Sequence, residues 1–116
     1  MAVGPPCQGD VWWVDLHPVI GSEVAKTRPA LVVSIDEINR APARLCIVAP
    51  ITTTPRESAV RIELSREDGS IRLGYVEPYQ IRAVSRDRLT SRIDTADETV
   101  RREVAHRIEL FTRCRL

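Results

Sequence analysis

Residues 1–93 consist of short apolar or alternating runs that are separated by Pro, Gly, Asp and Asn. This spacing is typical of small antiparallel strands and does not fit helices. We predict three early strands, at Val11 to Leu16, Ala30 to Ser34 and Leu45 to Pro50.

The middle of the chain predicts two further strands. Residues 60–64 alternate apolar with charged side chains, which is the period of a strand with one buried and one wet face. Residues 67–70 read as a turn, and residues 74–84 are again strand-like. Because Pro78 interrupts this last segment and has no N–H to donate, we predict a sheet edge or a bulge there.

Only the C-terminal region has the spacing of a helix. Thr95 and Glu98 form a capping box that predicts where the helix begins. An apolar stripe follows at helical spacing, formed by Val100, Val104, Ile108 and Phe111. We expect this stripe to pack on the sheet or on another subunit.

Length and composition indicate one domain. With 116 residues, 43% of them hydrophobic, the chain has enough apolar material for one core and too little for two. We assign residues 1–8 to a flexible N-terminus and residues 9–116 to a single domain. The predicted fold class is mostly β with α additions, a small curled β-barrel with a C-terminal helix.

Charge and cysteine content indicate which partners, metal sites and cell compartment the protein can have. The 17 basic and 16 acidic residues argue neither for nor against a polyanionic partner. The odd set Cys7, Cys46 and Cys114 contains no CxxC pair, which argues against a disulfide framework and a zinc site, and Cys46 lies in an apolar run typical of burial. No leader pattern or run of roughly 18 apolar residues is present. We therefore expect a cytoplasmic protein with no membrane association.

Two polar clusters flank the predicted strands. Arg28 opens the second strand beside Pro29, which restricts the backbone, and Thr52, Thr53 and Thr54 follow the third. If these strands are neighbours, the clusters converge. A guanidinium beside hydroxyl groups suits a phosphodiester better than a carbonyl or a metal. The alternative is that the threonines are ordinary strand and turn residues.

Several motifs occur together and in order. They are Gly9-Asp10-Val11-Trp12-Trp13-Val14-Asp15-Leu16, Gly21-Ser22-Glu23, Arg28-Pro29-Ala30-Leu31-Val32-Val33-Ser34, Ala49-Pro50-Ile51-Thr52, Gln80-Ile81-Arg82 and Arg88-Leu89-Thr90-Ser91-Arg92-Ile93. This set, which spans nearly the whole chain, resembles the MazF/PemK-type toxins, the endoribonuclease half of toxin–antitoxin pairs.

The resemblance implies a fold, an activity and partners. The fold would be an SH3-like barrel of the PemK/CcdB type, assembled as a homodimer. The activity would be sequence-specific cleavage of single-stranded RNA, namely mRNA and also candidate tRNA or rRNA, without metal or cofactor. The 2′-hydroxyl would attack to leave a 2′,3′-cyclic phosphate and a 5′-hydroxyl. A MazE-like antitoxin would inhibit through an extended acidic segment.

The family's catalytic arginine and threonine match Arg28 and Thr52. Arg28 would stabilise charge on the phosphate and donate to the leaving oxygen, and Thr52 would hold the phosphate in line. The proton acceptor stays open between Glu23 and His17, each of which has an ordinary loop role as its alternative. The RNA-binding candidates are Ser22, Lys26, Thr53, Thr54, Gln80 and Arg82.

Two other features have a double interpretation. Adjacent Trp12 and Trp13 face opposite ways on a strand, so one fills the core and the other serves a subunit contact or an unpaired base. The basic stretch Arg82, Arg86, Arg88 and Arg92 either guides RNA or forms a solvated edge.

The first loop departs from the family pattern at Val24 and Lys26, where glutamine and glycine are common, so base preference does not carry over. Two rival functions remain. One is a non-catalytic SH3-like binding module, and the other is a CcdB-like gyrase poison, whose tryptophan-containing C-terminus is not matched by Phe111 to Leu116.

Overall fold

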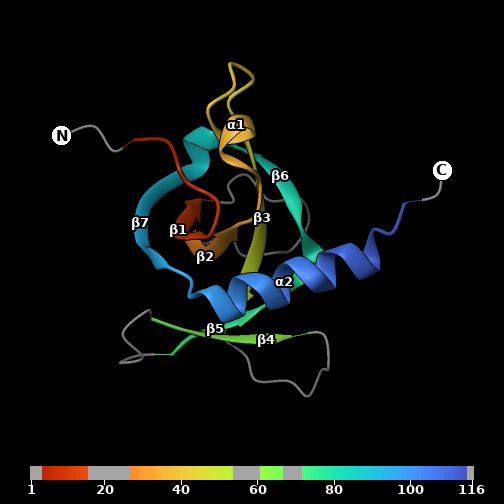
Figure 1. Ribbon diagram of the computed structural model, residues 1–116. Coiled ribbons are helices and arrows are strands. Elements are labelled where there is room, and N and C mark those ends of the chain that lie inside the picture. The colour runs from red at the N-terminus through yellow and green to blue at the C-terminus, as the bar shows by residue number, and fades with distance from the viewer. Residues whose placement is uncertain (1–3, 16–26, 54–60, 67–71, 115–116) are drawn as a thin grey trace, which may run out of the picture.

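The computed structural model describes residues 4–15, 27–53, 61–66 and 72–114 (Figure 1). Seven strands, two 3-10 turns and two helices occur in these residues. The strands are β1 (Asp10–Asp15), β2 (Thr27–Val32), β3 (Leu45–Thr52), β4 (Ile62–Ser65), β5 (Arg72–Val76), β6 (Arg82–Ser85) and β7 (Leu89–Thr95). The remaining elements are α1 (Asp36–Asn39), η1 (Pro78–Gln80), η2 (Arg86–Arg88) and α2 (Glu98–Phe111).

The strands form one antiparallel sheet in the order β4-β5-β3-β2-β1-β7, and β6 also pairs with β3. Strand β3 pairs with β2 along one edge, and its other edge is shared by β6 and then by β5. Figure 1 shows the sheet curling into a half-barrel with α2 lying across it. The predicted fold class, mostly β with a C-terminal helix, is confirmed.

The two faces of the curled sheet bury separate apolar clusters. The helix-side cluster lies under α2 and comprises Val11, Leu31, Ala49, Ile51, Ile62, Leu64, Val76, Ala96, Val100 and Val104. The inner cluster fills the concave face and comprises Trp12, Val14, Ala30, Val32, Cys46, Val48, Val84 and Leu89. Because both faces are covered over much of their length, the early strands are apolar at consecutive positions and do not alternate.

The predicted strands are present with shifted boundaries. Strand β2 begins at Thr27 and ends at Val32, and the N–H groups of Val33 and Ser34 beyond it still donate to the Ile47 carbonyl of β3. The alternation in β4 is confirmed where it is described, since Ile62 and Leu64 are buried and Glu63 is exposed. Val60 and the predicted turn at 67–70 lie outside the described residues.

Pro78 interrupts the predicted strand-like segment 74–84, which η1 divides into β5 and β6. Strand β5 pairs with β3 in the register Ile51 to Val76, whereas β6 pairs in the register Val48 to Arg82. Three extra residues of the β5–β6 segment are therefore accommodated between the two pairings, and η1 forms there. The start of η1 is fixed to the sheet by a 3.0 Å hydrogen bond from the Glu77 N–H to the Pro50 carbonyl.

The predicted start of the C-terminal helix is wrong. The N-cap of α2 is Asp97, whose side chain accepts a 2.8 Å hydrogen bond from the Val100 N–H. Thr95 is still in β7, where it is paired with Asp10. Sheet pairing extends β7 to Thr95, the first residue of the predicted capping box, and Glu98 pairs with Arg102 on the helix surface.

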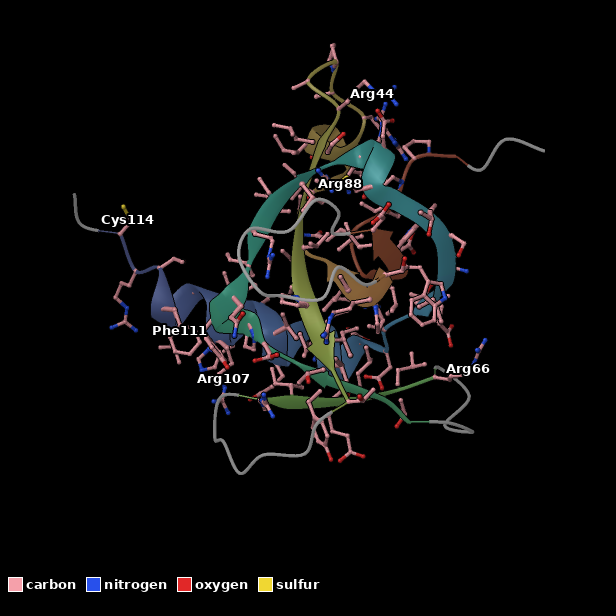
Figure 2. All side chains as sticks on the ribbon, turned by 180° about the vertical axis from the view of Figure 1, so that it is seen from behind. Arg44, Arg66, Arg88, Arg107, Phe111 and Cys114 are labelled. Carbon is pink, nitrogen blue, oxygen red and sulfur yellow. The ribbon has the colours of Figure 1, made fainter. Side chains whose placement is uncertain are left out.

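The apolar stripe on α2 is confirmed only in part. Val100 and Val104 are buried and Ile108 is half-buried against the helix-side cluster. Phe111 is 47% exposed, because the last turn of α2 extends past the buried part of the sheet (Figure 2). Among the described residues, no helix is long and apolar enough to cross a membrane.

We expect Asp97→Ala to lower the free energy of unfolding by about 1 kcal/mol, because it removes an N-cap acceptor. Asp97→Asn, which keeps an acceptor, should cost less. Urea unfolding of both variants and of Thr95→Ala measures the difference. A larger loss for Thr95→Ala than for Asp97→Ala would support the capping box read from the sequence over the observed cap.

Candidate active site

Arg28 and Thr52 lie on neighbouring strands. Strands β2 and β3 pair Val32 with Val48, Leu31 with Ala49 and Ala30 with Pro50. The same register, continued two residues further, places Arg28 opposite Thr52. Opposed residues of antiparallel strands have Cα atoms about 5 Å apart and project to the same face. The structure therefore places the two predicted catalytic residues on adjacent strands, at the same end of the sheet and on the same face.

The pairing of β2 with β3 stops just before this position. Pro29, which the register places opposite Ile51, has no N–H to donate to the ladder. The Arg-Pro pair thus ends the β2–β3 ladder at Ala30 while Arg28 stays paired to Val14 of β1 on its other side. Arg28 is exposed, and Thr52 is half-buried at the end of β3.

The two residues project to the concave face of the sheet. Arg28 alternates with Ala30 and Val32, which belong to the inner cluster, and Thr52 has the same parity as Val48. The guanidinium of Arg28 and the hydroxyl group of Thr52 consequently lie at the border of the inner apolar cluster.

The same cross-strand row contains residues that the sequence interpretation missed. Thr52 is paired with Tyr75 of β5, and Tyr75 is paired with Glu63 of β4. An aromatic ring and a carboxylate therefore follow the hydroxyl of Thr52 along one line across the sheet. The alternation of residues 60–64 placed Glu63 on the wet face of its strand, but the partner strand was not visible in the sequence.

Gly74 allows β5 to approach the end of β3. Its φ is +139°, and a Cβ built on it would lie 2.6 Å from the Thr52 carbonyl oxygen and 2.8 Å from Ile51 Cγ2. No side chain fits this contact with the backbone. A lone glycine inside a strand-like segment is the signal that could have predicted a close approach.

Several predicted residues lie outside the described part of the chain. They are His17, Ser22, Glu23, Lys26 and Thr54, together with Val24. Thr53 directly follows β3 and is exposed. The roles of these residues remain predictions.

Gln80 and Arg82 lie further from the Arg28–Thr52 pair. Arg82 is exposed and opposite Val48, which is about 13 Å from Thr52 at 3.3 Å per residue. Gln80 is on η1, and its amide donates a 3.2 Å hydrogen bond to the carboxylate of Glu77. Glu77 is 8% exposed and also accepts from Arg61 and from the Tyr79 hydroxyl at 2.6 Å.

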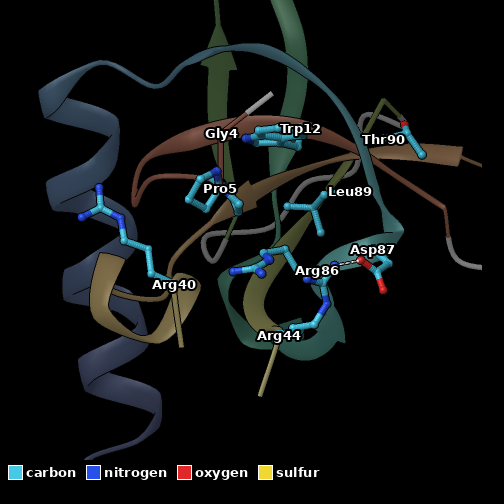
Figure 3. A pocket seen from close by; sticks show the side chains of 10 residues that line it. Gly4, Pro5, Trp12, Arg40, Arg44, Arg86, Asp87, Leu89 and Thr90 are labelled. Atoms are coloured by element: carbon cyan, nitrogen blue, oxygen red, sulfur yellow. Dashed lines mark hydrogen bonds and ion pairs between the residues drawn. The ribbon is translucent and has the colours of Figure 1, made fainter. Parts of the chain in front are cut away.

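Three arginines of the predicted basic stretch bind the protein itself. Arg86 donates to the Asn39 carbonyl at 2.5 Å and points into a cavity (Figure 3), and Arg88 donates to the Asp15 carbonyl at 3.3 Å. Arg92 forms an ion pair with Asp10 at 3.3 Å. Of the four arginines, only Arg82 has no side-chain partner among the described residues. The stretch is therefore mostly structural.

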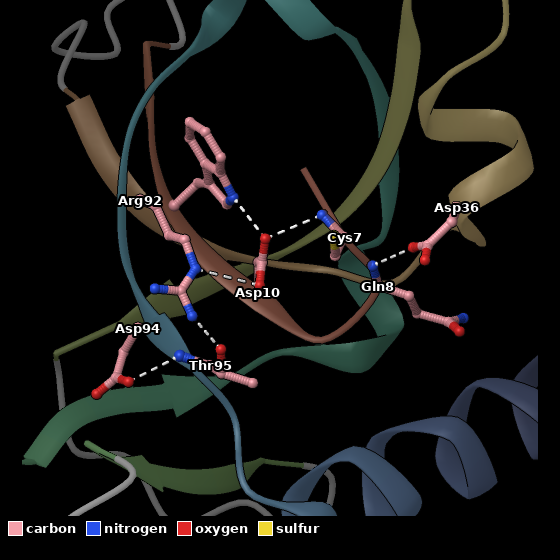
Figure 4. A network of polar contacts seen from close by, with 8 residues as sticks. Cys7, Gln8, Asp10, Asp36, Arg92, Asp94 and Thr95 are labelled. Atoms are coloured by element: carbon pink, nitrogen blue, oxygen red, sulfur yellow. Dashed lines mark hydrogen bonds and ion pairs between the residues drawn. The ribbon is translucent and has the colours of Figure 1, made fainter. Parts of the chain in front are cut away.

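Asp10, in the Gly-Asp-Val-Trp motif, has a structural role. It is 8% exposed and accepts hydrogen bonds from the Cys7 N–H at 2.9 Å and from Trp12 Nε1 at 3.2 Å, besides its ion pair with Arg92 (Figure 4). Gln8 donates through its N–H to Asp36 and through its side chain to the Val33 carbonyl. Cys7 and Gln8, which we placed in the N-terminal segment, are thus held against β1, β7 and α1.

The two tryptophans divide as predicted. Trp12 is 4% exposed in the inner cluster, and Trp13 is 40% exposed. Cys46 is buried as predicted, and burial raises the pKa of its thiol, with the positive charge of Arg86 acting in the opposite direction. Among the described residues, no group of three His, Cys, Asp or Glu side chains is placed to hold a metal ion.

Comparison with known proteins identifies the family. Residues 7–112 match the model of the "PemK-like, MazF-like toxin of type II toxin-antitoxin system". The chain belongs to this family. It is also 33% identical over 106 residues to Endoribonuclease EndoA of Bacillus subtilis, covering 89% of this chain and 90% of the relative.

Solved structures share the fold. MazF from Deinococcus radiodurans superposes with a TM-score of 0.81 at 24% identity, over 97% of this chain and 100% of the other. A MazE-MazF crystal structure from the same organism matches with the same TM-score, identity and coverage. The resemblance to the MazF/PemK-type toxins inferred from the motifs is confirmed.

We predict that Gly74→Ala disturbs Thr52, because the added methyl group meets the Thr52 carbonyl. Its melting temperature should fall by several degrees, and its RNA cleavage should fall by more than the folded fraction explains. Gly4→Ala is the matched control, since a Cβ at Gly4 meets nothing within 4 Å. Equal behaviour of the two variants in thermal unfolding would contradict the close approach.

Proposed function

We propose that this chain is an endoribonuclease toxin that cleaves single-stranded RNA at specific sequences without a metal ion. The observation that carries the proposal is the placement of Arg28 and Thr52 on adjacent strands and on one face of the sheet. Membership of the PemK-like, MazF-like family and the 33% identity to an endoribonuclease support it. mRNA is the proposed main substrate, and its cleavage would occur in the cytoplasm.

The proposed reaction uses the RNA's own 2′-hydroxyl as the nucleophile. The 2′-oxygen bonds to phosphorus as the bond to the 5′-oxygen breaks, which leaves a 2′,3′-cyclic phosphate and a 5′-hydroxyl. Arg28 stabilises the added negative charge and donates to the departing oxygen, because a guanidinium is a permanent multiple donor. Thr52 donates to a non-bridging oxygen and keeps the phosphate in line. We propose Glu23 and His17 as the candidates for the proton acceptor.

Recognition of the RNA extends from this pair in two directions. Tyr75 and Glu63 continue the cross-strand row beyond Thr52, where a ring can stack on a base and a carboxylate can accept from a base amino group. The first loop contributes Ser22 and Lys26, the strand end contributes Thr53 and Thr54, and Gln80 and Arg82 contact more distant nucleotides.

We also propose a MazE-like antitoxin as the inhibitor of this chain. The matched MazE-MazF structure supports this proposal at the level of the fold. An acidic antitoxin segment that covers Arg28 and Arg82 would block the path of the RNA by occupying the same cationic groups.

RNA cleavage in a chelating buffer tests the mechanism. We expect the parent protein to cut a long single-stranded RNA to 2′,3′-cyclic phosphate ends. Arg28→Ala should lower kcat/KM by about 100- to 1000-fold, because a donor to the developing charge is lost. Thr52→Ala should lower it by at least roughly tenfold through lost positioning.

Thr52→Ser, which keeps the hydroxyl, and Arg102→Ala, which changes an exposed arginine on α2, are the controls for this assay. Both should cut at close to the parent rate. Undiminished cleavage by Arg28→Ala would overturn the mechanism, and no cleavage by the parent would favour a non-catalytic binding module.

We propose a homodimer as the working form. Tyr79, Leu110 and Phe111 are each 44 to 47% exposed, and η1 and α2, which carry them, are in contact. Exposed apolar side chains of this size suit a subunit interface. Sedimentation velocity should give the mass of two chains for the parent and a smaller mass for Phe111→Asp. A parent that sediments as a single chain at micromolar concentration would contradict the dimer.

A further inference from the structure

A cationic cavity lies on the half-barrel beside the N-terminal segment. Its volume is about 580 Å³, and neither Arg28 nor Thr52 lines it. Its arginines come from three places in the fold: Arg40 follows α1, Arg44 precedes β3 and Arg86 begins η2. The N-terminal segment supplies Pro5 to the opposite wall (Figure 3).

Arg86 is fixed with its guanidinium in this cavity (Figure 3). One nitrogen donates to the Asn39 carbonyl at 2.5 Å, and the Arg86 N–H donates to the Arg44 carbonyl at 2.7 Å. Asn39 is itself fully buried and bonded to Ser34 through both ends of its amide. The charge is therefore presented by a rigid support, and the remaining donors of the guanidinium fork are available to a ligand.

The backbone at Arg44 is held in an unusual conformation. Its φ is +57°, the left-handed region that few residues other than glycine adopt. Hydrogen bonds from the Arg44 N–H to Ala41 and from Arg86 to the Arg44 carbonyl maintain it. This turn directs Arg44 toward the cavity wall, where it pairs with Asp87. Such strained residues concentrate at binding sites.

The lining carries a net charge of +2, since three arginines are opposed by the single carboxylate of Asp87. The Arg44–Asp87 pair is solvent-exposed, with 54% and 67% of the side chains accessible, so it contributes little stability of its own. The side chain of Arg40 has no hydrogen bond or ion pair within the described part of the chain. Pro5, Trp12 and Leu89 form apolar walls that concentrate the field of these charges.

We propose that this cavity binds the phosphate monoester group of a nucleotide. A phosphate monoester carries close to two negative charges at neutral pH, which matches the charge of the lining. Its three oxygens accept from the forked donors of Arg86 and Arg44 better than a single carboxylate does. The volume falls in the range of small-molecule sites, and the hydroxyl of Thr90 adds a polar group at the rim.

Titration with adenosine 5′-monophosphate, followed by 15N–1H chemical shifts, tests this site. We expect saturable shifts of Trp12 and Thr90 with the monophosphate and with inorganic phosphate, and none with adenosine. The diester 2′,3′-cyclic adenosine monophosphate, with one charge, should bind at least fivefold more weakly. Equal binding of adenosine and its monophosphate would overturn the proposal.

Two variants separate this site from the catalytic one. Arg40→Ala combined with Arg44→Ala, both at exposed positions, should weaken monophosphate binding at least tenfold and leave RNA cleavage within twofold of the parent. Arg28→Ala should lower cleavage by about 100- to 1000-fold and leave monophosphate binding unchanged. Loss of binding in Arg28→Ala but not in the double variant would place the phosphate in the catalytic site and refute the second site.

The source of the phosphate is resolved by two non-cleavable 2′-O-methyl oligonucleotides, one with a 5′-phosphate and one with a 5′-hydroxyl. Tighter binding of the phosphorylated oligonucleotide, lost in the double variant, assigns the cavity to the end of an RNA chain. Equal binding of the two, with the free monophosphate still bound, assigns it to a free nucleotide. An acidic peptide that displaces the monophosphate and binds more tightly would overturn the proposal in favour of a protein partner.

Discussion

The register between β2 and β3 is the constraint on which the candidate site depends. Strand β3 has partners along both edges, so its position is fixed by β2 on one side and by β5 and β6 on the other. A slip of β2 by one residue against β3 would turn Ala30 and Val32 out of the inner cluster and bring the opposite face of β2 inward. Burial of both clusters therefore also fixes the positions of Arg28 and Thr52, and stability and function rest on the same pairing.

Two residues with unusual backbone properties, Pro29 and Gly74, modify the regular sheet next to the candidate site. Pro29 ends the ladder beside Arg28, and Gly74 lets β5 come close to the Thr52 carbonyl. At the start of β1, Asp10 and Arg92 connect the N-terminal segment to β7 through a hydrogen bond and an ion pair. The polar residues of the strongest sequence motifs are thus divided between two tasks. Arg28 and Thr52 are the residues that we propose for the chemistry, while Asp10 and most of the later arginines hold segments together.

Much of the fold was predictable because apolar runs and turn residues are local signals. The early strands, the alternation in β4, the interruption at Pro78 and the burial of Trp12 and Cys46 all follow from them. The start of α2 was not predictable from the sequence. Thr95 and Glu98 fit the capping-box pattern, but Thr95 pairs with Asp10 in the sheet and Asp97 caps the helix instead. The exposure of Phe111 depends on where the sheet ends. The placement of Arg28 near Thr52 was predicted only on the condition that their strands are neighbours. The cross-strand pairing of Thr52 with Tyr75 could not be predicted, because it depends on which strands pair, and no local sequence pattern determines that.

The most direct test is a crystal structure of the protein with an RNA whose reactive 2′-hydroxyl is replaced by hydrogen, so that the RNA binds but is not cut. We predict that one phosphate lies within roughly 2.7 to 3.2 Å of both the Arg28 guanidinium and the Thr52 hydroxyl. A scissile phosphate in contact with neither residue, or with only one of them while the other faces solvent, would contradict it.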